Sequence, residues 1–141
     1  MKIIIKNKFA FLFLSILVLS GCLLFIGCSK TSNADPTGTI TTTISNRGKI
    51  YIDTLDSPNG FIGYSDTTGS YYFVAGNGQI TTVGNVADLA AITSKPGTGY
   101  SYTSKAIAGN GYVLLFVGGY CRVYLVAMSG SSATIKYQYP Y

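Results

Sequence analysis

Few side chains in this chain of 141 residues could do chemistry: it has three cysteines, five acidic residues and no histidine. A Ser-His-Asp or Cys-His nucleophile system uses imidazole as its base, and a His-ligated zinc site uses imidazole as a ligand. The lack of histidine therefore excludes the most common catalytic constellations. We expect a protein without enzymatic activity, cofactor or metal.

Three aspartates, Asp53, Asp56 and Asp66, are the only candidates for a catalytic carboxylate pair. Glycosidases use two carboxylates at set distances across a cleft. However, Asp56 and Asp66 begin the sequences DSPNG and DTTG, where aspartate commonly bonds to the backbone of a turn. A calcium loop would need more oxygen ligands at closer spacing. We expect turn-forming roles, and a paired-aspartate hydrolase is the weakest of our hypotheses.

Two of the three cysteines belong to an N-terminal segment that has the pattern of a secretory signal. Three lysines within the first eight residues precede an almost unbroken apolar run over residues 9–26. Cys22 and Cys28 each follow a glycine, in LSGC and FIGC. Both sequences resemble the lipobox of bacterial lipoproteins, in which the thiol is acylated and the cysteine becomes the new N-terminus.

We favour Cys28 as the lipidated residue and keep Cys22 as the alternative. LSGC is the better motif, but cleavage before Cys22 would leave LLFI on the mature chain, whereas polar SKTSN follows Cys28. This predicts a signal peptide over 1–27, a lipidated cysteine with a flexible tether over 28–38, and one domain over 39–141.

A competing interpretation leaves the N-terminal segment uncleaved. The 19 residues of 9–27 approach the about twenty that a membrane-spanning helix needs, and the lysines would stay in the cytoplasm. Either way, the domain is expected outside the cytoplasmic membrane, in the cell envelope.

The positive charge of the chain gives no sign of a nucleic-acid partner. The formal charge of +5 includes the three leader lysines, and the remaining seven basic residues are scattered among the five aspartates. Nucleic-acid binding needs clustered cations that neutralise a run of phosphates. We therefore expect partners other than nucleic acid.

After the tether, short stretches rich in Ile, Val, Thr, Tyr and Phe alternate with turn sequences. This spacing predicts an all-β, mainly antiparallel fold, a small sandwich or barrel. The candidate strands are Thr39–Ser45, Lys49–Thr54, Phe61–Ser65, Tyr71–Ala75, Gln79–Val83, Tyr112–Val117, Tyr120–Ala127 and Ala133–Tyr139. Asn77-Gly78 and Gly118-Gly119 are expected to form hairpin turns.

One segment, Asn85–Ile92, departs from the strand pattern. It contains good helix formers, an Asn in the cap position and Asp88 three residues later, which resembles a capping box. We expect one short helix there.

The last strands show which side chains face the core. Alternation in Tyr120–Ala127 places Cys121, Val123, Leu125 and Ala127 on one face, and we expect this face to be buried. Cys121 is then a core thiol without a base to activate it. In Ala133–Tyr139 the odd-numbered residues are expected to face the core.

The opposite face of the same strand carries Tyr120, Arg122 and Tyr124, in a chain that has 12 tyrosines and no tryptophan. Tyrosine combines a broad apolar ring with a hydroxyl group, which suits surfaces that bind sugars or proteins. We take this row as the candidate binding surface. Tyrosine is also a common strand residue, so a purely structural role is the competing interpretation.

The junction GCSK at residues 27–30 resembles those of small surface or periplasmic lipoproteins of Bacteroidetes-type bacteria. The final 30 residues, with GYV, YCRVYLV and the closing KYQYP, are similar to the end of an uncharacterised domain family of such lipoproteins. The resemblance implies a secreted, mostly β domain and brings no catalytic residues. We therefore expect a lipid-anchored envelope protein that binds a protein or glycan, or else an accessory subunit of an envelope complex.

Overall fold

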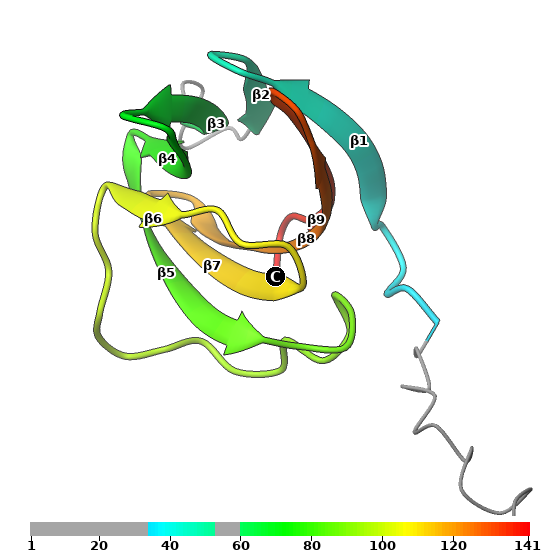
Figure 1. The fold of residues 1–141 in the computed structure, drawn as a ribbon. Helices are drawn as coiled ribbons and strands as arrows, with labels where there is room; N and C mark the ends of the chain where they lie inside the picture. Colours follow the sequence, from blue (N-terminus) through cyan, green and yellow to red (C-terminus); the bar gives the residue numbers. More distant parts are fainter. Residues whose placement is uncertain (1–33, 53–59) are drawn as a thin grey trace, which may run out of the picture. The chain divides into compact units, whose positions relative to one another are not determined.

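The computed structural model describes residues 34–52 and 60–141, which form two antiparallel sheets that face each other (Figure 1). The strands are β1 (Ile40–Ser45), β2 (Lys49–Ile52), β3 (Gly60–Thr67), β4 (Ser70–Gly76), β5 (Gly78–Asn85), β6 (Thr103–Lys105), β7 (Asn110–Phe116), β8 (Gly119–Ser129) and β9 (Ser132–Gln138). The five-stranded sheet has the order β1-β9-β8-β7-β5, and the four-stranded sheet has the order β2-β3-β4-β6. The expected all-β, antiparallel sandwich is confirmed.

The core lies between the sheets and follows from strict alternation along the strands. Ile62, Phe73, Leu114, Leu125 and Ile135 are fully buried there. A fully buried side chain of this kind stabilises the fold by about 1.5–3 kcal/mol. The odd-numbered residues of β9 face this core, as expected from the sequence.

Tyr112 connects the two sheets through its phenolic oxygen. This oxygen donates a hydrogen bond to the Lys105 carbonyl at 2.9 Å and accepts one from the Ile107 amide at 2.8 Å. Tyr112 belongs to β7 of the five-stranded sheet, whereas Lys105 ends β6 of the other sheet. Burial raises the pKa of the Tyr112 hydroxyl, so it stays a neutral donor. The sequence pattern did not indicate the three-residue strand β6. The buried Tyr112 hydroxyl holds the end of this strand by its hydrogen bond to Lys105.

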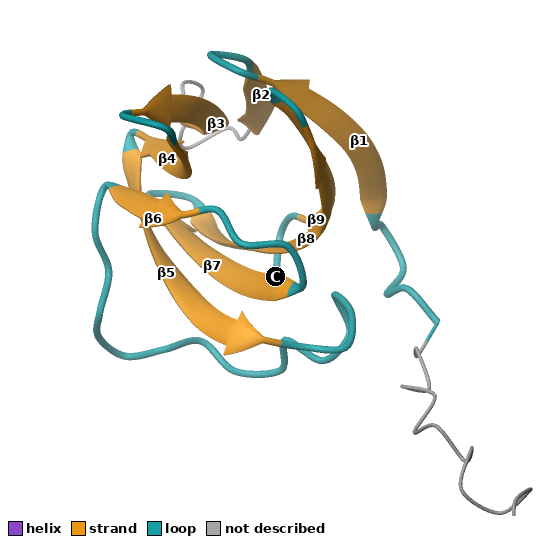
Figure 2. Ribbon diagram, in the orientation of Figure 1, coloured by secondary structure: helices purple, strands orange, loops and turns teal. Residues whose placement is uncertain are grey.

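The helix expected over Asn85–Ile92 is not present, and that prediction is wrong. Asn85 still belongs to β5, and a single turn follows in which the Asp88 carboxylate accepts the Ala91 amide at 2.9 Å. Asp88 therefore caps the turn, in place of Asn85. A helix of one turn gains few backbone bonds for the residues that it fixes, and Pro96 lies close behind. Figure 2 shows no helix among the described residues.

Two further expectations are corrected by the strand pairing. Asn77-Gly78 is no hairpin turn, since β4 and β5 belong to different sheets and the chain crosses between them at Asn77. Ala127 is exposed, because the register of β8 against β9 shifts between Leu125 and Ala127. The extra residue of a bulge reverses the alternation, so Met128 packs against the core instead. A hairpin between β7 and β8 is confirmed, but its two turn residues are Val117 and Gly118, because Gly119 already pairs with Phe116 as the first residue of β8.

Candidate functional site

The candidate surface Tyr120, Arg122 and Tyr124 lies on the outer face of the five-stranded sheet and is half-buried. Residues 86–100, which we call the cover segment, pack over this face. Leu89 and Ile92 of the cover segment are fully buried in a second apolar cluster, against which both tyrosines pack. The outward alternation of the three side chains is therefore confirmed, but they lie beneath the cover segment and not on an open surface.

Arg122 is the polar centre of this second cluster. Its Nη1 donates to the Ile92 carbonyl at 2.7 Å, while Nε and Nη2 both donate to Gln138 Oε1, at 2.8 and 2.6 Å. The ring of Tyr141 lies 4.6 Å from the guanidinium carbon. Lys95 Nζ lies 4.9 Å from the centre of the Tyr120 ring and 5.1 Å from that of Tyr141. These contacts fasten the cover segment and leave the row little capacity to bind a ligand.

Of the other candidates for chemistry, the structure describes only Cys121 and Asp66. Cys121 is fully buried, and burial raises the pKa of its thiol, so the expected core role is confirmed. Asp66 is exposed at the end of β3, where its amide donates to Asn46 Oδ1 at 2.9 Å. Asp53, Asp56, Cys22 and Cys28 lie outside the described residues. Within the described ranges, no group of acidic, histidine or cysteine side chains could hold a metal ion.

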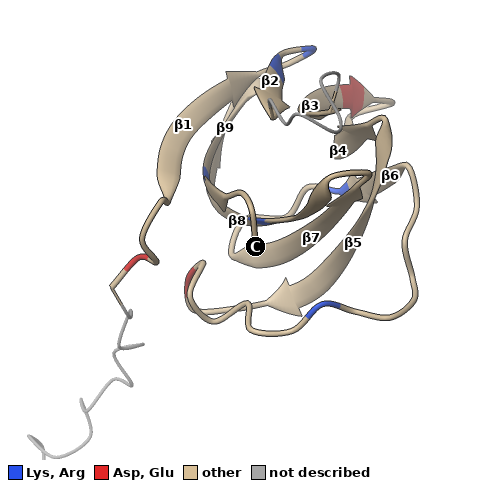
Figure 3. Cartoon of the chain, turned by 180° about the vertical axis from the view of Figure 1, so that it is seen from behind, with Lys and Arg blue, Asp and Glu red and all other residues tan. Residues whose placement is uncertain are grey.

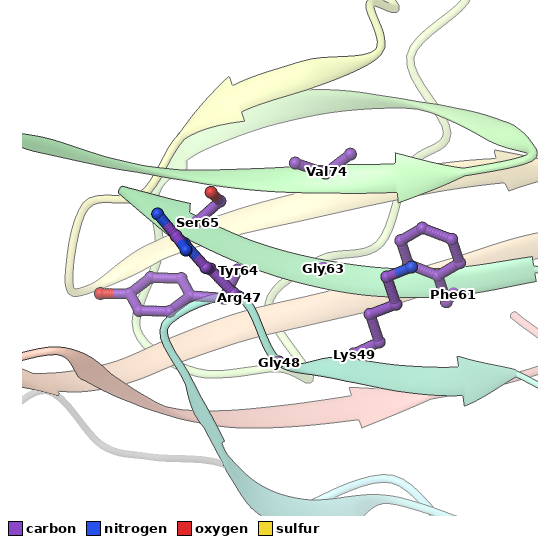
Figure 4. A pocket seen from close by; sticks show the side chains of 8 residues that line it. All are labelled: Arg47, Gly48, Lys49, Phe61, Gly63, Tyr64, Ser65 and Val74. Atoms are coloured by element: carbon purple, nitrogen blue, oxygen red, sulfur yellow. The ribbon is translucent and has the colours of Figure 1, made fainter. Parts of the chain in front are cut away.

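A groove of about 240 Å³ opens instead on the outer face of the four-stranded sheet (Figure 4). Two basic side chains, an aromatic ring and two glycines dominate its walls. The lining residues are Arg47, Gly48, Lys49, Phe61, Gly63, Tyr64, Ser65 and Val74. They come from the turn after β1, from β2, from β3 and from β4, and no cover segment passes over them among the described residues.

Two glycines leave room for the Phe61 ring at one side of this groove. A Cβ added at Gly63 would lie only 3.2 Å from the Phe61 ring and 3.3 Å from the Val74 Cβ. At Gly76, opposite Phe61 in the pairing of β3 with β4, a Cβ would overlap the same ring at 1.9 Å. The ring of Phe61 therefore lies flat over Gly76, as an aromatic side chain often covers a cross-strand glycine. A larger residue at either position would displace Phe61 and fill the groove.

The Phe61 ring contacts a cation that lines the groove and a second aromatic ring that lies next to the groove. Lys49 Nζ lies 4.5 Å from the centre of the Phe61 ring, within cation–π range. Tyr51 meets the same ring edge-on, with 6.0 Å between the ring centres, and remains 64% exposed. Lys49 and Tyr51 share one face of β2 because they are two residues apart. The wall thus offers an exposed aromatic ring beside an ammonium group.

Arg47 stands at the other side of the groove, in an unusual backbone conformation. Its φ is 64°, in the left-handed region that glycine and asparagine adopt more easily. The Arg47 amide donates to the Tyr64 carbonyl at 2.7 Å, which fixes the turn against β3. Its side chain is exposed and makes no ion pair with any described residue. The turn therefore presents a guanidinium that forms no ion pair within residues 34–52 and 60–141.

The sequence contained part of the signal for this groove. The alternation of Lys49 and Tyr51 was visible, and Asn46-Arg47-Gly48 is recognisable as a turn. The missing information was the pairing of β2 with β3, which places Tyr51 opposite Phe61 and Lys49 opposite Gly63. A long-range register of this kind cannot be read from local alternation.

Comparison with protein families, curated proteins and solved structures found no match. No helix of residues 34–52 and 60–141 is long and apolar enough to cross a membrane. The membrane-spanning alternative concerned residues 9–27, which lie outside these ranges.

Proposed function

We propose that this protein is a lipid-anchored component of the cell envelope whose β domain binds a glycan or a protein and performs no chemistry. The observation that supports binding is the groove on the four-stranded sheet, which has two basic side chains and the half-buried Phe61 ring in its lining. Arg47 makes no ion pair with a described residue, and the exposed Tyr51 contacts Phe61. The lipid anchor rests on the apolar run that ends before Cys28. The resemblance to Bacteroidetes-type lipoproteins is consistent with both parts.

The binding surface is proposed at the groove and not at the row of Tyr120, Arg122 and Tyr124. The row is half-buried, and the donors of Arg122 are engaged with Ile92 and Gln138. A ligand would have to displace these bonds before it could gain its own. Such a site would bind weakly, since a ligand then only exchanges one partner for another.

The anchor is tested by the intact mass of the protein extracted from membranes. We expect a chain that starts at residue 28 and carries acyl chains, and we expect Cys28→Ala to abolish both processing and acylation. Cys22→Ala is the matched control and should change only the mass of the removed leader. An unprocessed, unacylated chain would refute the lipid anchor, and acylation lost only in Cys22→Ala would move it to that residue.

Binding is tested by capture of envelope material on the purified full-length protein. The comparison is between wild type and a protein in which Arg47 and Lys49 are both replaced by glutamine. We expect the double variant to retain less glycan or protein from a detergent extract of envelopes. Equal retention would refute binding at the groove.

One observation favours the alternative function, an accessory subunit of an envelope complex held by an uncleaved N-terminal helix. Among the described residues β1 pairs only with β9, so its other edge is open. Its sequence ITTTIS lacks the charges and proline that commonly protect an edge strand from pairing. If a subunit adds a strand there, Thr43→Lys should reduce the size of the complex extracted from membranes, whereas Thr67→Lys on β3 should not.

A further inference from the structure

The described basic residues of the domain divide between its two outer faces, and the two sets differ in their partners. Lys49 contacts the Phe61 ring, much as Lys95 contacts Tyr120 and Tyr141. On the side of the five-stranded sheet, Lys136 pairs with Asp35 at 2.6 Å, while Arg122 and Lys95 are engaged in the second cluster. The other described cations are Arg47, Lys49 and Lys105, all on the four-stranded sheet or its adjoining turn (Figure 3). None of these three forms an ion pair within the described ranges.

Among residues 34–52 and 60–141, no carboxylate lies at an outer position of the four-stranded sheet. Its one described aspartate, Asp66, lies opposite Tyr71 and so belongs to the column of β3 residues that faces inward with Tyr64. The outward column of β3 carries Phe61, Gly63 and Ser65. The described part of this face is therefore uniformly positive.

Strand pairing spreads the cations along the face. Lys49 on β2 lies opposite Gly63, which lies opposite Val74 on β4. Lys105 lies opposite Tyr72 at the other edge of the same sheet. With about 4.8 Å between neighbouring strands, β2 and β6 are roughly 14 Å apart. A chain-like ligand that crosses the strands would meet a cation at each edge of the sheet.

We propose that this groove binds an acidic polysaccharide, a glycan whose sugars carry carboxylates. The proposal rests on the proposed function and names its ligand class. Arg47 and Lys49 supply charge-assisted hydrogen bonds to the carboxylates. Tyr51 and Phe61 supply the apolar surface on which the C–H face of a sugar ring packs. Gly63 and Gly76 leave room for the Phe61 ring to lie against the backbone of the sheet, which sets the position of this apolar surface.

Two features favour this ligand over other anions. A nucleic acid presents a run of phosphates, and three separated cations neutralise few of them. A free anion such as phosphate would need converging donors in an enclosed pocket, whereas this groove is open and apolar in its middle, at Gly63 and Val74. Sparse charge beside exposed rings matches a polymer that carries one carboxylate on each sugar.

The backbone conformation of Arg47 allows a substitution that removes the charge without adding backbone strain. Because its φ is 64°, Arg47→Gly removes the guanidinium and relieves an unfavourable conformation at the same time. We expect this variant to be at least as stable as wild type, and its urea midpoint checks that a loss of binding comes from the missing guanidinium. Thr68→Gly is the matched control, since Thr68 in the next turn has a φ of 51° and carries no charge. Lys136→Gln, on the other sheet, controls for net charge.

The experiment measures binding of full-length protein in detergent to oligogalacturonate and to a neutral glucan oligosaccharide of equal length. We expect binding of the uronate alone, weakening as salt rises. Arg47→Gly and Lys49→Gln should each weaken it by about 5- to 10-fold, a loss that corresponds to one charge-assisted contact. Thr68→Gly and Lys136→Gln should bind as wild type does.

Several results would overturn the proposal. Equal binding of the neutral glucan, of polyglutamate or of a single-stranded oligonucleotide would show that carboxylated sugar is not what the groove selects. Failure to bind the uronate, or binding unaffected by Arg47→Gly, would do the same. In each case the proposed function would still be judged separately, by whether the double glutamine variant loses capture of envelope material.

Discussion

The outer faces of the two sheets carry similar side chains and use them differently. On the five-stranded sheet, Arg122 lies beneath the cover segment, bonded to Ile92 and Gln138. At the edge of the four-stranded sheet, Arg47 lies at the side of the groove away from Phe61 and makes no ion pair among the described residues. Both faces combine cations with aromatic rings, so composition alone does not separate a structural cluster from a candidate binding site. The two are separated by whether the N–H donors of the arginine are hydrogen-bonded to other described residues of the protein.

This difference predicts that substitutions on the covered face cost stability, whereas those on the open face change binding. The largest effect is expected from Leu89→Ala. Leu89 is fully buried under the cover segment, and truncation of such a leucine costs about 2–4 kcal/mol. Urea unfolding measures the change in the free energy of unfolding. A loss below about 1 kcal/mol in the free energy of unfolding would mean that the cover segment detaches easily. The claim that substitutions on the covered face reduce stability would then be refuted.

Arg122→Met should be the next most damaging substitution. It keeps an apolar chain under Tyr141 but leaves the Ile92 carbonyl and Gln138 Oε1 without their donor. Unsatisfied buried acceptors cost about 1–3 kcal/mol, measured by the same unfolding experiment. Lys105→Met on the open face is the control and should stay within about 0.5 kcal/mol of wild type. Equal effects of the two would refute the distinction.

Tyr112→Phe tests how the two faces are coupled. The substitution removes the hydroxyl that bonds the Lys105 carbonyl and the Ile107 amide, and we expect a loss of about 1–2 kcal/mol. Faster amide hydrogen exchange should be confined to β6 and the residues after it. Tyr102→Phe, at a position that is 73% exposed, serves as control. Unchanged exchange in β6 would mean that this strand is held by its pairing with β4 alone.

The smallest effect, opposite in sign, is expected for Arg47→Gly. Relief of the left-handed conformation should stabilise the protein by about 0.5–1 kcal/mol, as the urea midpoint would show. Thr68→Gly should give a similar gain. If Arg47→Gly destabilises the fold while Thr68→Gly does not, the guanidinium has a structural partner and the open face resembles the covered one.

Local sequence signals predicted most of the fold. Eight of the nine strands in the described part of the chain were located, because alternation and turn residues act over a few positions. β6 was not predicted, because its three residues are too few to show an alternating pattern. It is held in place by pairing with Tyr72–Val74 and by the hydrogen bond from Tyr112. The helix over 85–92 failed because Leu89 and Ile92 gain more by burial on the sheet than a single turn offers.

The site was harder to predict for a related reason. Alternation along β8 correctly placed Tyr120, Arg122 and Tyr124 outward, but an outward side chain is exposed only if nothing packs over it. Fifteen residues of the cover segment intervene, and their position depends on tertiary contacts such as that of Ile92 with Gly111. The groove likewise depends on which strands pair, and this decides which side chains become neighbours.

The ion pair between Lys136 and Asp35 would also limit how far the domain could move from the proposed lipid anchor. Gln138 Nε2 donates to the Thr37 carbonyl at 2.8 Å, so the chain is fixed to β9 from Asp35 onward. An extended chain advances about 3.5 Å per residue, so a lipid on Cys28 would keep Asp35 within about 25 Å of the membrane surface. With so short a tether between the proposed lipid and Asp35, the domain would bind only polymers that lie close to the same membrane.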